Sequence, residues 1–265
     1  MMLIINAFLW SDSTMLNTWL NDGEKLEPLG SGIKLIVSAE HTFGTDTVLL
    51  AGFSSPRKND KACELGTGCG AIPLIWSRDN VPAHVTAVDI QASACSLLQR
   101  SVELNSLQQR ITVLNSDLLD LKGKVLLSSY DLVVCNPPYK AAGTGIVNPE
   151  EVHKIARHEF ACTMDDIVRV AAGLLNFSGR FCLCQRPERL SDIICSMRKY
   201  GIEPKRLRFV QQRISKEPKL FLIEGRRGGR PNGLRIEPTL LIEKNDGSLS
   251  DEMIAIYGAY KEDYL

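Results

Sequence analysis

The strongest constraint on the fold is a regular alternation between short apolar segments and amphipathic ones. The apolar segments "KACELG", "HVTAVDI", "YDLVVCN" and "GRFCLCQ" have nearly continuous hydrophobic cores. Stretches with helical spacing, such as "QASACSLLQRSVELN", lie between them. Strands that are apolar on both faces are typical of a parallel sheet covered by helices on both sides. The sequence therefore predicts an α/β fold with a Rossmann-like, mostly parallel sheet.

The order of the expected elements divides the chain into two parts. Residues 1–55 are predicted to form an N-terminal extension with a strand, a turn and a short helix at 45–53. A polar linker, "SSPRKND", leads into a main domain at residues 56–265. In that domain we expect helices at 71–79, 91–105, 164–175 and 190–199, and late strands at 205–210, 219–225 and 238–243.

The composition limits the classes of protein to which the chain can belong. Its 265 residues allow a large core, and its formal net charge of zero gives no global attraction to polyanions. The eight cysteines include no C-x-x-C pair, which predicts reduced core thiols and no metal site. The opening "MMLIINAFLW" is too short to span a bilayer and lacks a basic leader. We therefore expect a cytoplasmic protein with no membrane association, and no pattern indicates an oligomeric state.

A glycine-rich turn follows the first apolar strand and precedes a helix. In "ELGTGCG", Gly66, Gly68 and Gly70 allow a tight turn and a close approach of a ligand to the backbone. The G-x-G-x-G spacing differs from the G-x-G-x-x-G of dinucleotide sites, and Glu64 places a carboxylate before the turn. A carboxylate suits a cationic ligand better than a pyrophosphate. This favours S-adenosyl-L-methionine, which has a sulfonium and a ribose diol but no phosphate.

Acidic residues also end the next two strands. Asp89 lies about twenty residues after the glycine turn, the spacing of ribose-binding carboxylates. It could equally cap the following helix. Asp117 ends the third strand in "NSDLLD". Because ligands bind beyond the carboxyl ends of parallel strands, we expect Glu64, Asp89 and Asp117 at one ligand-binding edge of the sheet.

The stretch "YDLVVCNPPYK" ends a buried strand with an amide, two prolines and an aromatic ring. An ordinary turn is one interpretation, since Asn and Pro are common where strands end. The other is a site for a planar amine, because the side-chain oxygen of Asn136 and the carbonyl of Pro137 can accept its two hydrogens. Pro137 and Pro138 offer no competing N–H, and Tyr139 offers a face for stacking on a base. After the glycine turn and the two aspartates, the second interpretation is favoured.

Together these motifs resemble those of class I S-adenosylmethionine-dependent methyltransferases. "ELGTGCG" is similar to their first motif, "VDI" to the acidic second, "SDLLD" to the third and "NPPY" to the fourth. "NPPY" also resembles the signature of amino-group N-methyltransferases. "FGTDTVLLAGF", "ARHE" and "QRPERLSDI" resemble the bacterial valine-tRNA adenine-N6-methyltransferase family. The resemblance covers nearly the whole chain and implies the class I methyltransferase fold with a mostly parallel, seven-stranded sheet.

The resemblance also implies roles for individual residues. It assigns methyl transfer to Asn136, Pro137, Pro138 and Tyr139. Asp117 takes the position at which the family keeps an acceptor for the adenine amino group of the cofactor. Asp46 either contacts the cofactor or caps its own helix. The residues implied to bind S-adenosyl-L-methionine are Asp46, Glu64, Gly66, Thr67, Gly68, Gly70, Asp89, Ile90, Asp117, Leu118 and Asn136.

Basic residues cluster between positions 205 and 230 of an otherwise neutral chain. This cluster predicts a surface that contacts the phosphates of tRNA or another RNA, although a solvated sheet edge is the alternative. The residues assigned to the surface are Lys205, Arg206, Arg226, Arg227 and Arg230. The activity implied by the resemblance is methylation of an adenine N6 in tRNA. The alternatives are methylation of a glutamine amide in a translation release factor and a catalytically silent nucleic-acid-binding module.

Overall fold

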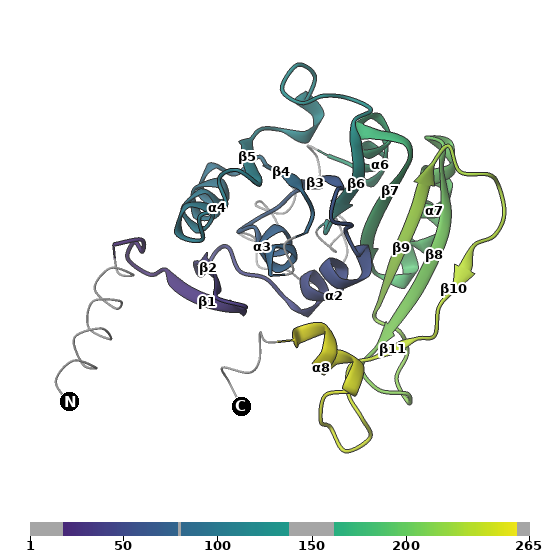
Figure 1. Cartoon of the computed structure of the whole chain (residues 1–265). Coiled ribbons are helices and arrows are strands. Elements are labelled where there is room, and N and C mark those ends of the chain that lie inside the picture. Colours follow the sequence, from purple (N-terminus) through teal and green to yellow (C-terminus); the bar gives the residue numbers. More distant parts are fainter. Residues whose placement is uncertain (1–17, 79–80, 138–161, 259–265) are drawn as a thin grey trace, which may run out of the picture.

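A nine-stranded, mostly parallel sheet forms the centre of the molecule (Figure 1). The computed structural model describes residues 18–78, 81–137 and 162–258. The strands run in the order β10-β8-β9-β7-β6-β3-β4-β5, with β11 also paired to β8. Their bounds are β3 Lys61–Leu65, β4 His84–Asp89, β5 Ile111–Asn115, β6 Tyr130–Cys135, β7 Leu175–Gln185, β8 Ile202–Gln211, β9 Leu220–Arg227, β10 Arg235–Ile236 and β11 Leu240–Leu241.

The predicted parallel arrangement is confirmed. Strands β3 to β7 pair in parallel, and only β9 runs antiparallel to its neighbours β7 and β8. The seven long strands are those expected for the fold. The difference is the addition of β10 and β11, two short strands that pair in parallel with β8. β11 lies within the strand predicted at residues 238–243, of which only Leu240 and Leu241 pair, whereas the two-residue β10 has no apolar pattern long enough to be recognised in the sequence.

Helices cover both faces of the sheet (Figure 1). One face carries α2, α3, α4 and α8, and the other carries α6 and α7. A capping box in which Thr163 and Asp166 bond each other's backbone N–H starts α6, and the hydroxyl of Ser250 caps α8. The bounds are α2 Thr45–Ser54, α3 Ala71–Ser77, α4 Ala92–Leu104, α6 Met164–Leu174, α7 Leu190–Lys199 and α8 Asp251–Tyr257.

Alternate residues of the central strands fill two separate cores. In β6, Leu132 and Val134 face the α2 side, whereas Val133 and Cys135 face the α6 side. This is the period of two expected for a strand. The next residue with the parity of Leu132 is Asn136. The alternation therefore directs its side chain toward α2.

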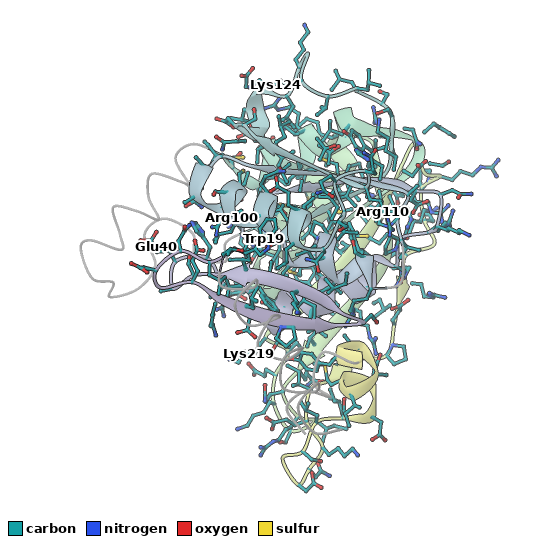
Figure 2. The ribbon with its side chains drawn as sticks, turned by 60° about the vertical axis from the view of Figure 1, so that its left-hand side comes forward. Trp19, Glu40, Arg100, Arg110, Lys124 and Lys219 are labelled. Carbon is teal, nitrogen blue, oxygen red and sulfur yellow. The ribbon has the colours of Figure 1, made fainter. Side chains whose placement is uncertain are left out.

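The N-terminal segment packs against α4. A hairpin of β1 (Lys25–Gly30) and β2 (Ile33–Val37) places Leu35 and Ile36 in the core that also contains α2 and α3. The backbone N–H of Ile36 donates to the hydroxyl of Ser101 at 2.9 Å. Figure 2 shows Arg100 of α4 beside Trp19, whose carbonyl accepts from its guanidinium at 2.7 Å. The division of the chain at residue 55 stays a prediction.

Two further sequence predictions concern cysteines and the membrane. All eight cysteines are free thiols and six of them are buried, but Cys162 is half-buried and Cys195 is exposed, so the prediction of core thiols is wrong for these two. Within the described ranges, no helix has the length and apolarity needed to cross a bilayer.

Candidate active site

The predicted ligand-binding residues follow neighbouring strands at one edge of the sheet, here called the carboxyl edge. The glycine turn follows β3, Asp89 ends β4, Asp117 follows β5 and Asn136 follows β6. Since these strands are adjacent in the order β6-β3-β4-β5 and parallel, their ends meet at the same edge. The topology therefore brings together motifs that lie up to 70 residues apart, between Gly66 and Asn136.

The glycine turn has an open part and a packed part. A Cβ added at Gly66 would have no heavy atom within 4 Å, whereas one added at Gly70 would lie 2.2 Å from Leu98 Cδ1. Both residues have left-handed backbones, with φ of +73° and +87°. Gly66 thus leaves space for a ligand, and Gly70 allows the turn to pack on α4.

Asp89 holds this turn in place. Its Oδ2 accepts from the N–H of Gly68 at 2.8 Å, and its Oδ1 accepts from the N–H of Gln91 at 2.9 Å. Helix α4 has Gln91 as its N-cap, without a side-chain cap. Asp89 is therefore a link between the two strand ends rather than the cap of the helix. Its contact with a ribose stays a prediction.

Glu64 is a buried acid beneath the turn. Only 2% of its surface is exposed, and the hydroxyl of Thr67 donates to its carboxyl group. Burial, with a smaller contribution from the negative charge of Asp89, raises the pKa of Glu64 well above its usual value. A cation placed nearby would reverse this shift, because it stabilises the ionised form. The acid therefore suits a positively charged ligand.

The ends of β4 and β5 supply apolar and polar groups to the same edge. Ile90 is 50% exposed, and Leu118 is half-buried. Asp117 accepts from the N–H of Leu119 at 2.8 Å with Oδ1 and begins a short 3-10 helix at Leu118–Asp120. An exposed isoleucine beside a carboxylate is a suitable surface for a flat heterocycle with an amino group.

Asn136 is held by helix α2 and strand β7. Its Nδ2 donates to Asp46 Oδ2 at 3.1 Å and to Thr47 Oγ1 at 3.0 Å. The thiol of Cys184 donates to its Oδ1 at 3.0 Å. Pro137 is buried, and the predicted residues Pro138 and Tyr139, together with "ARHE", lie outside the described residues.

Three of these contacts were not fully visible in the sequence. Helix α2 has Gly44 as its N-cap without a side-chain cap, so Asp46 contacts Asn136 instead of capping its helix. Thr47 and Cys184 were not predicted as site residues. The strand register explains the contact of Cys184. Cys135 pairs with Leu183, so the next residues along the two strands, Asn136 and Cys184, lie opposite each other and point to the same face of the sheet.

Comparison with known proteins identifies the family. The sequence profile of the methyltransferase small domain matches residues 38–187, more than half of the chain. The chain belongs to this family. A relative from Porphyromonas gingivalis named tRNA1(Val) (adenine(37)-N6)-methyltransferase is 29% identical over 80% of this chain and 86% of its own length. A relative of the same name from Aeromonas salmonicida is 25% identical over 80% of this chain and 87% of its own length.

Solved structures share the fold of this methyltransferase. A predicted O-methyltransferase from Agrobacterium tumefaciens has a TM-score of 0.66 at 19% identity, covering 82% of this chain and 97% of that one. M. jannaschii TYW2, solved in complex with AdoMet, has a TM-score of 0.51 at 14% identity, covering 78% and 87%. The predicted Rossmann-like methyltransferase fold is thus confirmed.

Of the predicted RNA-contacting residues of the methyltransferase, Arg226 and Arg227 lie toward the opposite, amino edge of the sheet. Since β9 runs antiparallel to β7, Arg226 pairs with Arg180, which pairs with Leu132 near the start of β6, whereas Phe221 pairs with Gln185 at the end of β7. Arg227 lies beyond Arg226, and its guanidinium donates to a backbone carbonyl at 2.8 Å. Arg226 and Arg227 are therefore remote from Asn136. The contact of the basic cluster with RNA stays a prediction.

Arg206 lies in a network of ion pairs. Its guanidinium forms ion pairs with Glu224 and Glu237, each at 2.9 Å, and lies 4.3 Å from the centre of the Phe53 ring. Glu224 also pairs with Arg180 at 3.4 Å. Arg206 therefore belongs to a largely buried charge network, and its contact with RNA stays a prediction.

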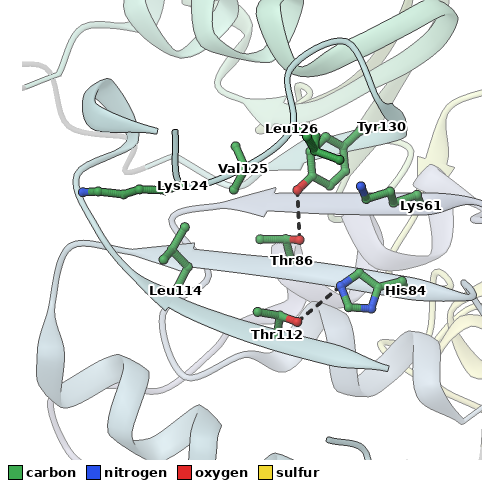
Figure 3. A pocket seen from close by; sticks show the side chains of 9 residues that line it. All are labelled: Lys61, His84, Thr86, Thr112, Leu114, Lys124, Val125, Leu126 and Tyr130. Carbon is green, nitrogen blue, oxygen red and sulfur yellow. Dashed lines mark hydrogen bonds between the residues drawn. The ribbon is translucent and has the colours of Figure 1, made fainter. Parts of the chain in front are cut away.

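A separate hollow lies on the α6 face of the sheet (Figure 3). It has a volume of about 220 Å³, and Lys61, His84 and Tyr130, from the starts of three strands, line it. In the figure, Tyr130 donates to Thr86, and His84 contacts Thr112. Because Lys61 and His84 begin their strands, the hollow is not the ligand site at the carboxyl edge.

Proposed function

We propose that this methyltransferase uses S-adenosyl-L-methionine to methylate the exocyclic N6 of an adenine in tRNA. The observation that carries the proposal is the position of Asn136, whose oriented carboxamide follows the strand next to the glycine turn. The curated relatives named as tRNA adenine-N6-methyltransferases, which match four fifths of the chain, support the same substrate.

The residues at the carboxyl edge fit the cofactor. The open space at Gly66 allows a ligand to contact the backbone, and the buried acid Glu64 favours a cation. Asp89 has the spacing of a ribose-binding carboxylate, and Ile90 and Asp117 suit an adenine. When bound there, S-adenosyl-L-methionine supplies an electrophilic methyl group on sulfur.

Asn136 and Pro137 prepare the amine for attack. The lone pair of an exocyclic amine on a purine is delocalised into the ring, so the amine is a weak nucleophile. Acceptors that hold its two hydrogens fix the orientation of the nitrogen, and they bind more strongly as positive charge develops on it. The side-chain oxygen of Asn136 and the carbonyl of Pro137 supply these acceptors in the proposed reaction.

Methyl transfer is tested with tRNA that lacks the modification. The protein is incubated with methyl-labelled S-adenosylmethionine and tRNA from a strain without this enzyme activity, and the digested nucleosides are separated. We expect labelled N6-methyladenosine with the wild type and none with Asn136→Ala. Cofactor affinity, measured by calorimetry, should remain nearly unchanged in Asn136→Ala. Labelling of glutamine in a release factor, with unlabelled tRNA, would contradict the proposal.

The side of the protein that contacts RNA is tested by salt dependence. Exposed Lys216 and Lys219 lie in the β8–β9 connection at the carboxyl edge, and Figure 2 shows Lys219 far from Lys124 of the β5–β6 loop. We propose that Lys216 and Lys219 contact phosphates near the reacting adenine. Their joint change to Ala should reduce the slope of log Kd against log salt by about 2. The matched control, Arg226→Ala with Arg230→Ala, should reduce the slope less than the lysine pair does, and a larger loss of slope there would assign the surface to the amino edge.

A further inference from the structure

We propose that Asp46 and Thr47 are positioning residues that set the orientation of the Asn136 carboxamide for methyl transfer. This inference rests on the proposed function and adds to it a role for helix α2. The motif that contains these residues, "GTDTVLL", lies 90 positions before Asn136 in the sequence. Its first turn lies next to Asn136 at the carboxyl edge.

The two acceptors determine which end of the amide is the nitrogen. Asp46 Oδ2 and Thr47 Oγ1 lie 3.1 Å and 3.0 Å from the same atom of Asn136. A carboxylate can only accept hydrogen bonds, so it attracts the NH₂ group and repels an amide oxygen. The nitrogen of Asn136 must therefore face α2, and the oxygen must face away from it.

Cys184 supports the same orientation from the other side. Its thiol lies 3.0 Å from the amide oxygen of Asn136 and is fully buried at the end of β7. A thiol is a weak donor, which matches an oxygen better than an NH₂ group. Contacts with α2 and β7 therefore favour the same orientation of the Asn136 carboxamide. In this orientation Oδ1 can accept a hydrogen bond from the substrate amine. A 180° rotation of the carboxamide would place its NH₂ group there instead, and two donors would then face each other.

The start of α2 is built to place the Asp46 carboxylate over Asn136. Gly44 precedes the helix, and a Cβ at Gly44 would lie 2.6 Å from Asp46 Oδ1. Glycine thus leaves the space that the carboxylate occupies. Thr45, in the same turn, contacts the hydroxyl of Tyr257 in α8 at 3.0 Å and does not contribute to the hydrogen bonds of Asn136 given above.

Isosteric substitution at Thr47 separates positioning from folding. Thr47→Val keeps the shape and removes one acceptor, so kcat should fall roughly fivefold to tenfold, and Asp46→Ala should reduce it about tenfold to a hundredfold. Cofactor Kd should change less than twofold in both variants. The matched control Thr45→Val removes a hydroxyl from the same turn that contacts Tyr257, and it should keep the wild-type kcat. Unchanged kcat in Thr47→Val and Asp46→Ala would overturn the inference. So would a loss of cofactor affinity equal to the loss of kcat in Asp46→Ala, because Asp46 would then be a cofactor ligand.

A second variant changes geometry without changing either acceptor. Gly44→Ala places a methyl group where the Asp46 carboxylate lies, and the carboxylate must rotate away. Since Gly44 is exposed and has an ordinary φ of −116°, stability should be close to that of the wild type. We expect a lower kcat with unchanged cofactor Kd. Wild-type kcat in Gly44→Ala would contradict a positional role for Asp46.

Nuclear magnetic resonance gives a measurement that does not depend on activity. In a sample labelled with ¹⁵N-asparagine, Asn136→Ala identifies the side-chain NH₂ pair of Asn136. Thr47→Val should shift this pair and accelerate its exchange with water, whereas Thr45→Val should leave it unchanged. If the wild type transfers no methyl group to tRNA, the proposed function fails. The response of the Asn136 NH₂ resonances to Thr47→Val still tests whether Thr47 orients the carboxamide. An NH₂ pair insensitive to Thr47→Val would refute it.

Discussion

Separate alanine substitutions at Gly66 and Gly70 distinguish the ligand-binding part of the glycine turn from its structural part. Both residues have left-handed backbones, which cost an L-residue about 1–2 kcal/mol. At Gly66 this is the whole expected cost, because the added Cβ has no neighbour within 4 Å. At Gly70 the Cβ would lie 2.2 Å from the side chain of Leu98, which is fully buried. Overpacking adds about 1–3 kcal/mol there.

Gly70→Ala should therefore lose more stability than Gly66→Ala, whereas Gly66→Ala should lose more cofactor affinity than Gly70→Ala. Gly66→Ala should lose about 1–2 kcal/mol of the free energy of unfolding, and Gly70→Ala about 2–5 kcal/mol. The Cβ at Gly66 occupies the space proposed for S-adenosylmethionine, so the Kd of S-adenosylmethionine for Gly66→Ala should rise about tenfold or more. Gly70→Ala, measured where it is folded, should bind more tightly than Gly66→Ala.

Denaturation and calorimetry provide the measurements. Urea unfolding with linear extrapolation gives the free energy of unfolding, and a constant m-value shows that the comparison is valid. Isothermal titration gives the cofactor Kd of each folded variant. The interpretation of the turn would be wrong if Gly66→Ala bound the cofactor like the wild type, or if it were the less stable of the two.

Three other predictions concern Glu64, Arg180 and Ser250. Because the folded pKa of Glu64 is raised, the free energy of unfolding of the ligand-free protein should fall as pH rises from about 4.5 through that pKa, and Glu64→Gln should lack this fall. Cofactor binding should release protons from the wild type but not from Glu64→Gln. Calorimetry in buffers of different ionisation enthalpy measures the number of protons released. Equal proton release from the two proteins would exclude Glu64 as the source. Arg180→Met leaves the buried carboxylate of Asp60 without its ion-pair partner and leaves Glu224 with Arg206 alone, and it should cost about 3–5 kcal/mol in urea unfolding; a loss below 1 kcal/mol would contradict a structural role. Ser250→Ala removes the cap of α8 and should cost about 1 kcal/mol by the same assay, with no change expected if the cap contributes nothing.

The succession of strands and helices along the chain and the glycine turn could be predicted because their signals are local. A continuous apolar strand, a turn and a helix follow one another within "KACELGTGCGAIPLIW". Parallel strands joined by helices then require the ends of β3 and β4 to share an edge. The proximity of Glu64, Asp89 and the turn follows from these local patterns and this general rule.

The contact between α2 and Asn136 could not be predicted because it depends on packing between distant segments. Asp46 is compatible in sequence with a helix cap, a cofactor ligand or a neighbour of any edge residue. Only the path of the chain before β3 places the first turn of α2 beside Asn136. Strand parity indicates that Asn136 faces α2 once the register is known, but parity does not give the angle at which α2 crosses the sheet.

The position of the basic cluster depends on one antiparallel strand. The sequence shows how many basic residues lie between 205 and 230, but the direction of β9 decides at which edge each one lies. A parallel β9 would have carried Arg226 and Arg227 to the carboxyl edge, next to Asn136. Because β9 is antiparallel, the start of the strand with Lys219 lies there instead, and the arginines lie at the amino edge.

Two groups of buried carboxylates differ in how their charges are compensated, and this difference bears on function. Asp60, which precedes β3, and Glu224 of β9 are neutralised by arginines, with Arg180 pairing both of them. At the carboxyl edge, Glu64 and Asp89 contact a hydroxyl and backbone N–H groups, and the repulsion between them contributes to the raised pKa of Glu64. Groups arranged in this way are stabilised by a cation that arrives with a ligand. The acidic edge thus reduces the stability of the ligand-free protein and favours the binding of a sulfonium.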